Sequence, residues 1–515
     1  MSSPPPHLPP PREEDMHVLI AFASELIGKK LATPNEARRN ESFVSKYGIP
    51  AADHHTTNKR TLPILDAIAS LSVFQDCGQV VAIALQMDLN TKTICLTVAE
   101  NRCGRVEPRV VTQIEEIWKI LQTLSNEYCR IRSLSRRMED PCEWGNRSPE
   151  PPTTGQISAI REQLVRLVYT FCWKKMSVRV EKWWPCLDSL CTRITSFLYI
   201  EDGEDASGLM NKFLGAVVIF RMALPMIKNR PDQSFTAELW NAYSERMEDA
   251  VENAVEVLRD DEKCEAWGKK FKEGDFDTPV RRGLEKLTSL HRYIDVLVRF
   301  ANSPRLRPAL SCRLAVHPVT PPHRRQIALP SSVDEWENTV NFVCAGKDFT
   351  TAGWSKTQAV KLADNFSTSY LCPTHCECSI AHLEAIHAPG ITPAFSYIGV
   401  SKFSCRACML WIAAFNRRGG RQYFTRGTHG KWYWPWAAPV PDLFPDEAAV
   451  VAKAVRAECV RFIQANGHFR AGSDSSDACA DRVTPRAQQI KEKFNLIIER
   501  EIESMMQKLK SQRAK

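Results

Sequence analysis

The sequence predicts an α/β core that carries a large all-helical block, and three observations support this. An amphipathic helix pattern at Thr61–Phe74 precedes two short, β-branched runs, the pattern of a helix followed by a β-hairpin. From Gln156 to Ala301 the apolar residues keep an almost continuous helical spacing. A short apolar run at Phe395–Val400 lies between two helix starts. With 515 residues the chain is too long for one core, so several domains are expected.

The N-terminal part predicts helices and a hairpin. Residues 1–15 hold six prolines and no apolar run, so they are expected to form a disordered Pro-rich tail. A helix is expected at Met16–Lys30. The hairpin strands are Val80–Leu85 and Thr93–Val98, joined by the turn residues around Asp88. We therefore expect residues 16–103 to form N-terminal helices and a hairpin.

The middle of the chain predicts a helical domain over residues 104–302, interrupted by a Pro-containing loop at Arg137–Gly155. Residues 303–332 hold six prolines and five arginines, which indicates an exposed linker. Residues 333–472 mix short strands and helices, with helices at Val333–Phe342 and Lys356–Asn365 but no convincing hairpin before residue 375.

Residues 473–515 predict a linker and a C-terminal amphipathic helix, whose apolar stripe can pack on the body of the protein or bind a partner helix. We favour packing on the body.

Composition excludes several classes of protein. Apolar residues make up 43% and charged residues 25%, so the chain is not disordered, collagen-like or a small disulfide scaffold. A net charge of +8 is too mild to indicate nucleic acid by itself. The longest apolar run, Leu214–Ile227, is too short for a membrane helix and no signal peptide is visible. We expect an intracellular protein of the cytoplasm or nucleus, without a membrane partner and with its 18 cysteines reduced.

The residues that carry chemistry are His375-Cys376-Glu377 and, 28 residues after Glu377, the pair Cys405 and Cys408. Both groups stand at predicted helix starts, where the helix dipole favours thiolate over thiol. One imidazole and two thiolates hold zinc and leave a position for water, which becomes a hydroxide nucleophile near neutral pH. A carboxylate two residues after the histidine can relay that proton to the ring and the departing amine. The pattern predicts a zinc-dependent hydrolytic deaminase of a nucleobase, with Zn²⁺ as cofactor, His375, Cys405 and Cys408 as ligands and Glu377 as catalytic proton shuttle.

Two alternatives stay open. The thiols can form a structural zinc cluster of Cys372, Cys376, Cys405 and Cys408, or they can be unrelated core residues. The chain can also be a non-catalytic, zinc-stabilised interaction scaffold that binds a protein partner through its helical domain or C-terminal helix. The presence of Glu377 favours the enzyme, because folding does not need that carboxylate.

The stretch resembles the fungal OTT-type deaminase-like family, which belongs to the cytidine-deaminase-like superfamily and is allied to bacterial toxin deaminases. The resemblance rests on His375-Cys376-Glu377, on the run Tyr397-Ile398-Gly399-Val400-Ser401-Lys402-Phe403-Ser404-Cys405-Arg406-Ala407-Cys408, and on Gly427-Thr428-His429-Gly430-Lys431-Trp432-Tyr433. It implies a three-layer α/β/α core with the ligands and shuttle named above. Ser404 and Cys376 depart from the superfamily, where proline and alanine are common. Neither departure removes a ligand.

A weaker likeness covers Thr61–Asn101, because the superfamily core opens with a helix and two strands before its H-x-E helix. It implies that the helical block is inserted into a deaminase core rather than placed before it. The hairpin should then lie in one sheet with Phe395–Val400, since a two-stranded hairpin is only marginally stable alone.

Basic and aromatic residues near the proposed site suggest a substrate. The cations of Arg417, Arg418 and Arg421 can hold phosphates, and Trp432 can stack on a base. His429 and Lys431 are further candidates for substrate binding. These residues suggest single-stranded nucleic acid or a nucleotide as partner. The plainer alternative is a solvated arginine loop beside core aromatics.

Overall fold

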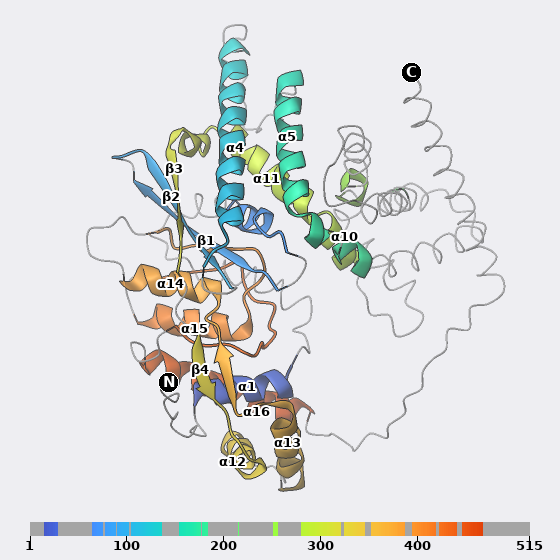
Figure 1. The fold of residues 1–515 in the computed structure, drawn as a ribbon, viewed down its shortest axis with the longest axis vertical. Helices are drawn as coiled ribbons and strands as arrows, with labels where there is room; N and C mark the ends of the chain where they lie inside the picture. The colour runs from blue at the N-terminus through green and yellow to red at the C-terminus, as the bar shows by residue number, and fades with distance from the viewer. Residues whose placement is uncertain are drawn as a thin grey trace, which may run out of the picture. The chain divides into compact units, whose positions relative to one another are not determined.

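The chain of the computed structural model divides into two compact units (Figure 1). The first unit consists of Met1–Val73, Gly78–Leu167 and Tyr293–Gly472, and the second of Phe74–Cys77, Val168–Arg292 and Ser473–Lys515. The described residues are 15–28, 64–75, 78–88, 90–101, 105–135, 154–176, 178–183, 215, 251–255, 280–320, 324–345, 352–386, 394–418, 422–439 and 445–466.

The main sheet of the first unit has four strands in the order β3-β2-β1-β6. β1 (Val81–Asp88) and β2 (Thr93–Glu100) form an antiparallel hairpin, as the sequence predicts. β6 (Gly399–Val400) pairs antiparallel with β1, and β3 (Arg313–Pro318) pairs parallel with β2. The mixed sheet therefore joins segments from the N-terminal part, the middle and the C-terminal part of the chain.

The predicted link between the hairpin and the strand around Ile398 is confirmed. Ala82 lies opposite Val400, and Ile83 lies opposite Gly399. The strand itself is shorter than the predicted Phe395–Val400, although Phe395 N donates to Leu85 O at 2.7 Å and so extends the contact along β1. The hairpin thus gains the third strand that it needs for stability.

Two expectations about the chain before His375 were wrong. The segment expected to be an exposed linker at 303–332 contains a 3-10 helix (Arg307–Ser311), β3 and β4 (Arg325–Ala328). The region before residue 375, expected to hold no convincing hairpin, contains β5 (Ser369–Cys372), which pairs antiparallel with β4 in a separate two-stranded sheet. These strands are short, and arginine or polar residues interrupt their apolar positions. Their pairing comes from tertiary context, which local propensity does not report.

Helices of the first unit stack in series on the hairpin (Figure 1). α14 (Cys376–Ile386) contacts β1 and β2, and α15 (Arg406–Arg417) contacts α14. α16 (Pro445–Asn466) packs on α15, and α1 (Met16–Leu26) packs on α16. All of α1 from Met16 to Ala23 is buried, so the N-terminal helix belongs to this core.

Three further helices of this unit are α4 (Pro108–Ser135), α12 (Val333–Cys344) and α13 (Ala352–Asn365). Asp15 caps α1 by accepting from His17 N, and Ser332 caps α12 by accepting from Glu335 N. α12 packs on α13, and α4 contacts β3. The helices expected at 333–342, 356–365 and 110–136 are thus present.

The other segments that the structure describes between residues 154 and 302 are mainly helical. They include α5 (Gly155–Phe171), α10 (Val280–Leu287), α11 (Ser289–Asn302) and residues 251–255. Within the second unit, Arg179 Nη1 donates to Ser289 Oγ at 2.6 Å. The tail expected over residues 1–15 lies outside the described residues except for Asp15, and the amphipathic helix expected at the C-terminus lies outside them entirely. Among the helices that are described, none is both long and apolar enough to cross a membrane.

Candidate metal centre

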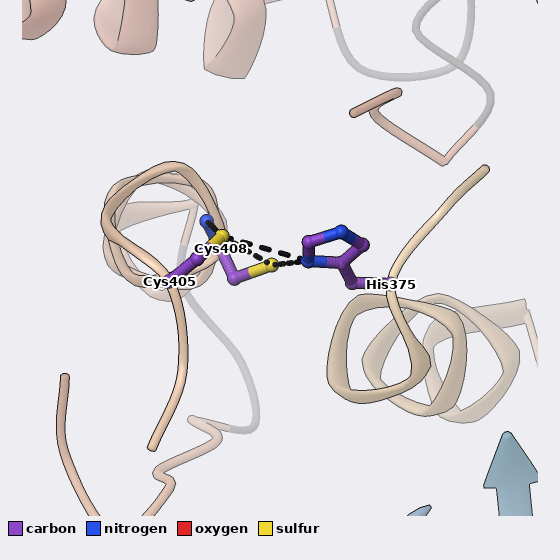
Figure 2. Close-up of side chains that lie close together, drawn as sticks. All are labelled: His375, Cys405 and Cys408. Carbon is purple, nitrogen blue, oxygen red and sulfur yellow. Dashed lines mark hydrogen bonds between the residues drawn. The ribbon is translucent and has the colours of Figure 1, made fainter. Parts of the chain in front are cut away.

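The side chains of His375, Cys405 and Cys408 face one another inside the first unit (Figure 2). His375 Nδ1 lies 3.5 Å from Cys405 Sγ and 3.2 Å from Cys408 Sγ. The two sulfur atoms are 3.3 Å apart. The structure therefore brings together the three residues that the sequence predicts as metal ligands.

Two helix starts position these side chains. His375 directly precedes α14, and its carbonyl oxygen accepts from Ser379 N at 2.9 Å as the first bond of that helix. Cys405 is the N-cap of α15 and accepts from the backbone N–H of Cys408 through its sulfur. Because α14 and α15 pack against each other, the imidazole and the two thiols converge.

The geometry and chemistry of this trio fit a zinc ion. Tetrahedral zinc with ordinary Zn–S and Zn–N bond lengths places its ligand atoms roughly 3.5–3.8 Å apart. The distances in the trio are close to this range, so a small adjustment of the side chains suffices. One imidazole and two thiolates are also soft enough to favour zinc over magnesium or calcium.

Burial opposes ionisation of the two thiols. It raises the pKa of Cys405 and of Cys408 well above the ordinary value of a cysteine. The expectation that the helix start favours thiolate is therefore outweighed by desolvation. A bound cation would reverse this balance, because it replaces the thiol protons.

Glu377 lies in the first turn of α14 and is only 4% exposed. Its carboxylate accepts from the Cys376 thiol at 3.3 Å and is close enough to His375 and Cys408 to affect both electrostatically. Glu377 is not part of the ligand trio. Cys372 and Cys376 are also outside the trio, so the geometry favours His375 over these thiols as the third ligand.

A partner of Cys408 that the sequence does not predict is Trp436. The indole Nε1 donates to Cys408 Sγ at 3.2 Å, and Trp436 is completely buried. Cys378 is a second hydrogen-bond partner of the Cys408 sulfur. The dense run of aromatic residues at 432–436 was the sequence signal that could have pointed to this contact. No spacing rule, however, connects an indole to a particular thiol.

The loop that contains His429 and Lys431 runs beside Cys405. Ser404 N donates to Gly427 O at 2.9 Å, and His429 N donates to Ser404 O. Arg406 N donates to Lys431 O on the other side of Cys405. Of the predicted substrate-binding residues, His429 and Lys431 are thus the two whose backbone lies against the start of α15.

Two of the other predicted substrate-binding residues, Arg417 and Arg418, are not brought to the trio. They are at the far end of α15 from Cys405, about 18 Å along the helix at 1.5 Å per residue. Arg418 instead forms an ion pair with Glu447, in which Nε lies 3.8 Å from Oε1. Trp432 is 3% exposed and packs in the core, which agrees with the plainer alternative for the aromatics. Arg421 lies outside the described residues.

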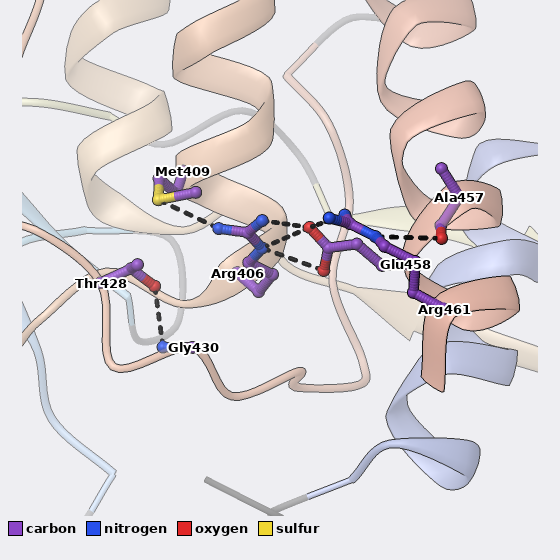
Figure 3. Close-up of polar contacts among 7 residues, drawn as sticks. All are labelled: Arg406, Met409, Thr428, Gly430, Ala457, Glu458 and Arg461. Atoms are coloured by element: carbon purple, nitrogen blue, oxygen red, sulfur yellow. Dashed lines mark hydrogen bonds and ion pairs between the residues drawn. The ribbon is translucent and has the colours of Figure 1, made fainter. Parts of the chain in front are cut away.

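Arg406, between the two cysteines, forms an ion pair with Glu458 of α16 (Figure 3). Its Nε lies 2.8 Å from Oε1 and 3.0 Å from Oε2 of the carboxylate. Both side chains are largely shielded from solvent. This cation therefore ties the ligand-bearing start of α15 to its neighbouring helix.

A buried polar network lies where the helix at residues 64–71 meets β6. Asp66 accepts from the Tyr397 hydroxyl at 2.7 Å and from Val400 N at 2.8 Å. Burial raises the pKa of Asp66 to about 6, and the nearby Arg426 partly opposes this shift. Arg426 donates to the Tyr293 hydroxyl at 2.6 Å and lies over the Phe403 ring. Arg426 therefore serves packing rather than an open basic surface.

Comparison with known families supports a deaminase-like domain. A family model described as OTT_1508-like deaminase matches residues 374–440, which include His375, Glu377, Cys405, Cys408 and Trp436. The match covers a small part of the chain. Neither the search of curated proteins nor the search of solved structures gave a match.

Proposed function

We propose that this chain is a zinc-dependent hydrolytic deaminase of a nucleobase, presented in nucleic acid, a nucleotide or a nucleoside. The observation that carries the proposal is the convergence of His375, Cys405 and Cys408 within the residues that match the deaminase family model. The buried carboxylate of Glu377 beside this trio supports a catalytic rather than a structural metal.

Each residue has a role in this mechanism. A zinc ion held by His375, Cys405 and Cys408 would supply Lewis acidity that makes water a nucleophile near neutral pH. Glu377 would take one proton from the attacking water and give it to the ring nitrogen, and would then pass the proton of the added hydroxyl to the departing amine, which leaves as ammonia. Its burial keeps bulk water from competing for that proton.

We further propose a cytidine-deaminase-like core of the fungal OTT type. The order of helix 64–71, the β1–β2 hairpin, α14, β6 and α15 supports this assignment. The helical block then interrupts that core, and residues 333–472 supply the catalytic part. The proximity of His429 and Lys431 to Cys405 supports a nucleotide or single-stranded nucleic acid as substrate.

The test measures zinc content and ammonia release by the full chain across nucleosides, nucleotides and single-stranded oligonucleotides. We expect one zinc per chain and turnover of at least one substrate. Glu377→Gln should retain zinc and melting temperature but lose ~10²–10⁴-fold or more in rate, as expected for general acid–base catalysis. Glu115→Gln, an exposed position on α4, is the matched control. Bound zinc without any turnover would favour a zinc-stabilised scaffold instead.

A further inference from the structure

The indole N–H, the single polar group of the Trp436 side chain, donates a hydrogen bond to a proposed metal ligand. An indole has one N–H and no acceptor, so it makes one conventional hydrogen bond. In Trp436 that bond goes to Cys408 Sγ at 3.2 Å, and both residues are 0% exposed. The bond therefore lies in a site without competing bulk water.

The neighbouring Trp434 shows that proximity alone does not produce this bond. Its Nε1 is buried and has no hydrogen-bond partner among the described residues. Its ring instead packs edge-on against Tyr370, with centroids 5.6 Å apart. Two tryptophans of one aromatic run thus differ in whether their N–H reaches the metal centre.

The backbone around Trp436 is held on two sides. Ala437 N donates at 3.0 Å to the carbonyl of Pro373, two residues before His375. Ala438 N donates to Nε2 of His17 on α1, and the His17 ring lies 6.1 Å from that of Trp436. The segment at 436–438 therefore connects the His375 side of the centre, the Cys408 side and the buried N-terminal helix.

We propose that Trp436 is a positioning residue of the metal centre, which orients Cys408 for coordination and increases the affinity for zinc. The inference rests on the proposed function, because it assumes that Cys408 is a ligand. A hydrogen bond to a thiolate is charge-assisted and stronger than one to a neutral thiol, so it favours the metal-bound form. Removal of such an outer partner typically costs 10–100-fold in metal affinity or activity.

The experiment compares full-length Trp436→Phe and Trp434→Phe with wild type. Zinc affinity is measured by competition with a chromophoric chelator, and cobalt-loaded samples are examined by absorption spectroscopy. For Trp436→Phe we expect affinity to fall ~10–100-fold. We also expect the thiolate-to-cobalt charge-transfer band to move to lower energy, because the sulfur loses a donor. Trp434→Phe should change neither quantity, since its N–H has no bond to lose.

A second measurement covers the case in which Trp436→Phe fails to fold. In cadmium-113-loaded wild-type protein, a scalar coupling between the metal and one indole proton would show the bond directly. Unchanged affinity and band position in a folded Trp436→Phe, or no such coupling in wild type, would overturn the inference. If zinc-loaded wild type deaminates no substrate while Cys408→Ser loses the metal, the proposed catalysis fails and the role of Trp436 at the metal centre stands.

Discussion

The carboxylate of Asp66 accepts a hydrogen bond from the backbone N–H of Val400 at 2.8 Å, across 334 residues of sequence. The same carboxylate binds the Tyr397 hydroxyl, and β6 pairs with β1 directly beside it. The residues that match the deaminase model thus share one core with the helix at residues 64–71 and with the β1–β2 hairpin. This relationship leads to the first three predictions.

A fragment that starts at residue 331 should not form a stable metal site. It would lack β1, β2 and β3, leaving β6 without its sheet, and it would lack Asp66. Circular dichroism and zinc content of the fragment, with the full chain as reference, test this. A fragment that melts like the full chain and binds one zinc would contradict the shared core.

Gly399→Ala should destabilise the first unit. A Cβ at this position would lie 2.5 Å from the backbone carbon of Leu65, so the helix at 64–71 has to move away from β6. Overpacking of this kind costs about 1–3 kcal/mol, and a clash with backbone belongs at the upper end. Urea unfolding measures the loss. Gly155→Ala is the matched control, because nothing lies within 4 Å of the added methyl group, and an equal loss there would refute the steric explanation.

Asp66 should make stability depend on pH. Burial raises its pKa from the ordinary 3.8 to about 6, so between these values the folded state holds a proton that the unfolded state has released. Its contribution to stability is therefore fully present below about pH 4 and is lost as the pH rises through 6. Relative to wild type, Asp66→Asn should gain about 2–3 kcal/mol between pH 4 and pH 7.

The free energy of unfolding at several pH values measures this difference. Asp364→Asn, at an exposed position on α13, serves as the control. A constant difference between Asp66→Asn and wild type across the range would show that Asp66 does not titrate in this way.

Removal of the Arg406 cation should loosen the start of α15. The bidentate contact with Glu458 is largely shielded, so Arg406→Gln leaves a carboxylate with few partners and should cost about 1–3 kcal/mol. Arg461 Nη2 lies 3.9 Å from Oε1 of the same carboxylate, but the Arg461 side chain is 72% exposed (Figure 3). Arg461→Gln should therefore change stability by less than about 0.5 kcal/mol. Similar losses in both variants would disprove the distinction.

Loss of one thiol should remove the metal. Cys405→Ser and Cys408→Ser each leave two ligands of the trio, and we expect zinc content after dialysis to fall from one per chain to near zero. Cys129→Ser changes a thiol of α4 outside the trio and should retain zinc. Stoichiometric zinc in a Cys405→Ser, Cys408→Ser double variant would show that the metal binds elsewhere.

The ligand trio could be predicted from sequence because its chemistry is local. His375 and Glu377 share one helix start, and Cys405 and Cys408 share another, so short spacings carry most of the geometry. The hairpin was predictable for the same reason, since β-branched runs flank recognisable turn residues. Its pairing with β6 followed from the need of a two-stranded hairpin for a sheet.

Other features depend on contacts that local patterns do not encode. β3 contains Arg313 and Pro318 and β4 contains Arg325, residues typical of a linker, and only their partners β2 and β5 make them strands. The donation from Trp436 to Cys408 joins residues whose separation follows no helical or strand period. At Cys405 the helix start lowers the thiol pKa and burial raises it. The sequence predicts the helix start, but only the structure shows that burial outweighs it.

The ion pair between Arg161 and Asp295 joins α5 to α11 at 3.2 Å, close to where the chain leaves the first unit after Leu167 and returns at Tyr293. The exit and return points are therefore fixed next to each other by contacts inside the first unit itself. A connection whose two ends are held together tolerates changes of length better than one whose ends are far apart. We therefore expect that a change of length between these two helices leaves the strand pairing of the sheet and the convergence of the His375 site in place.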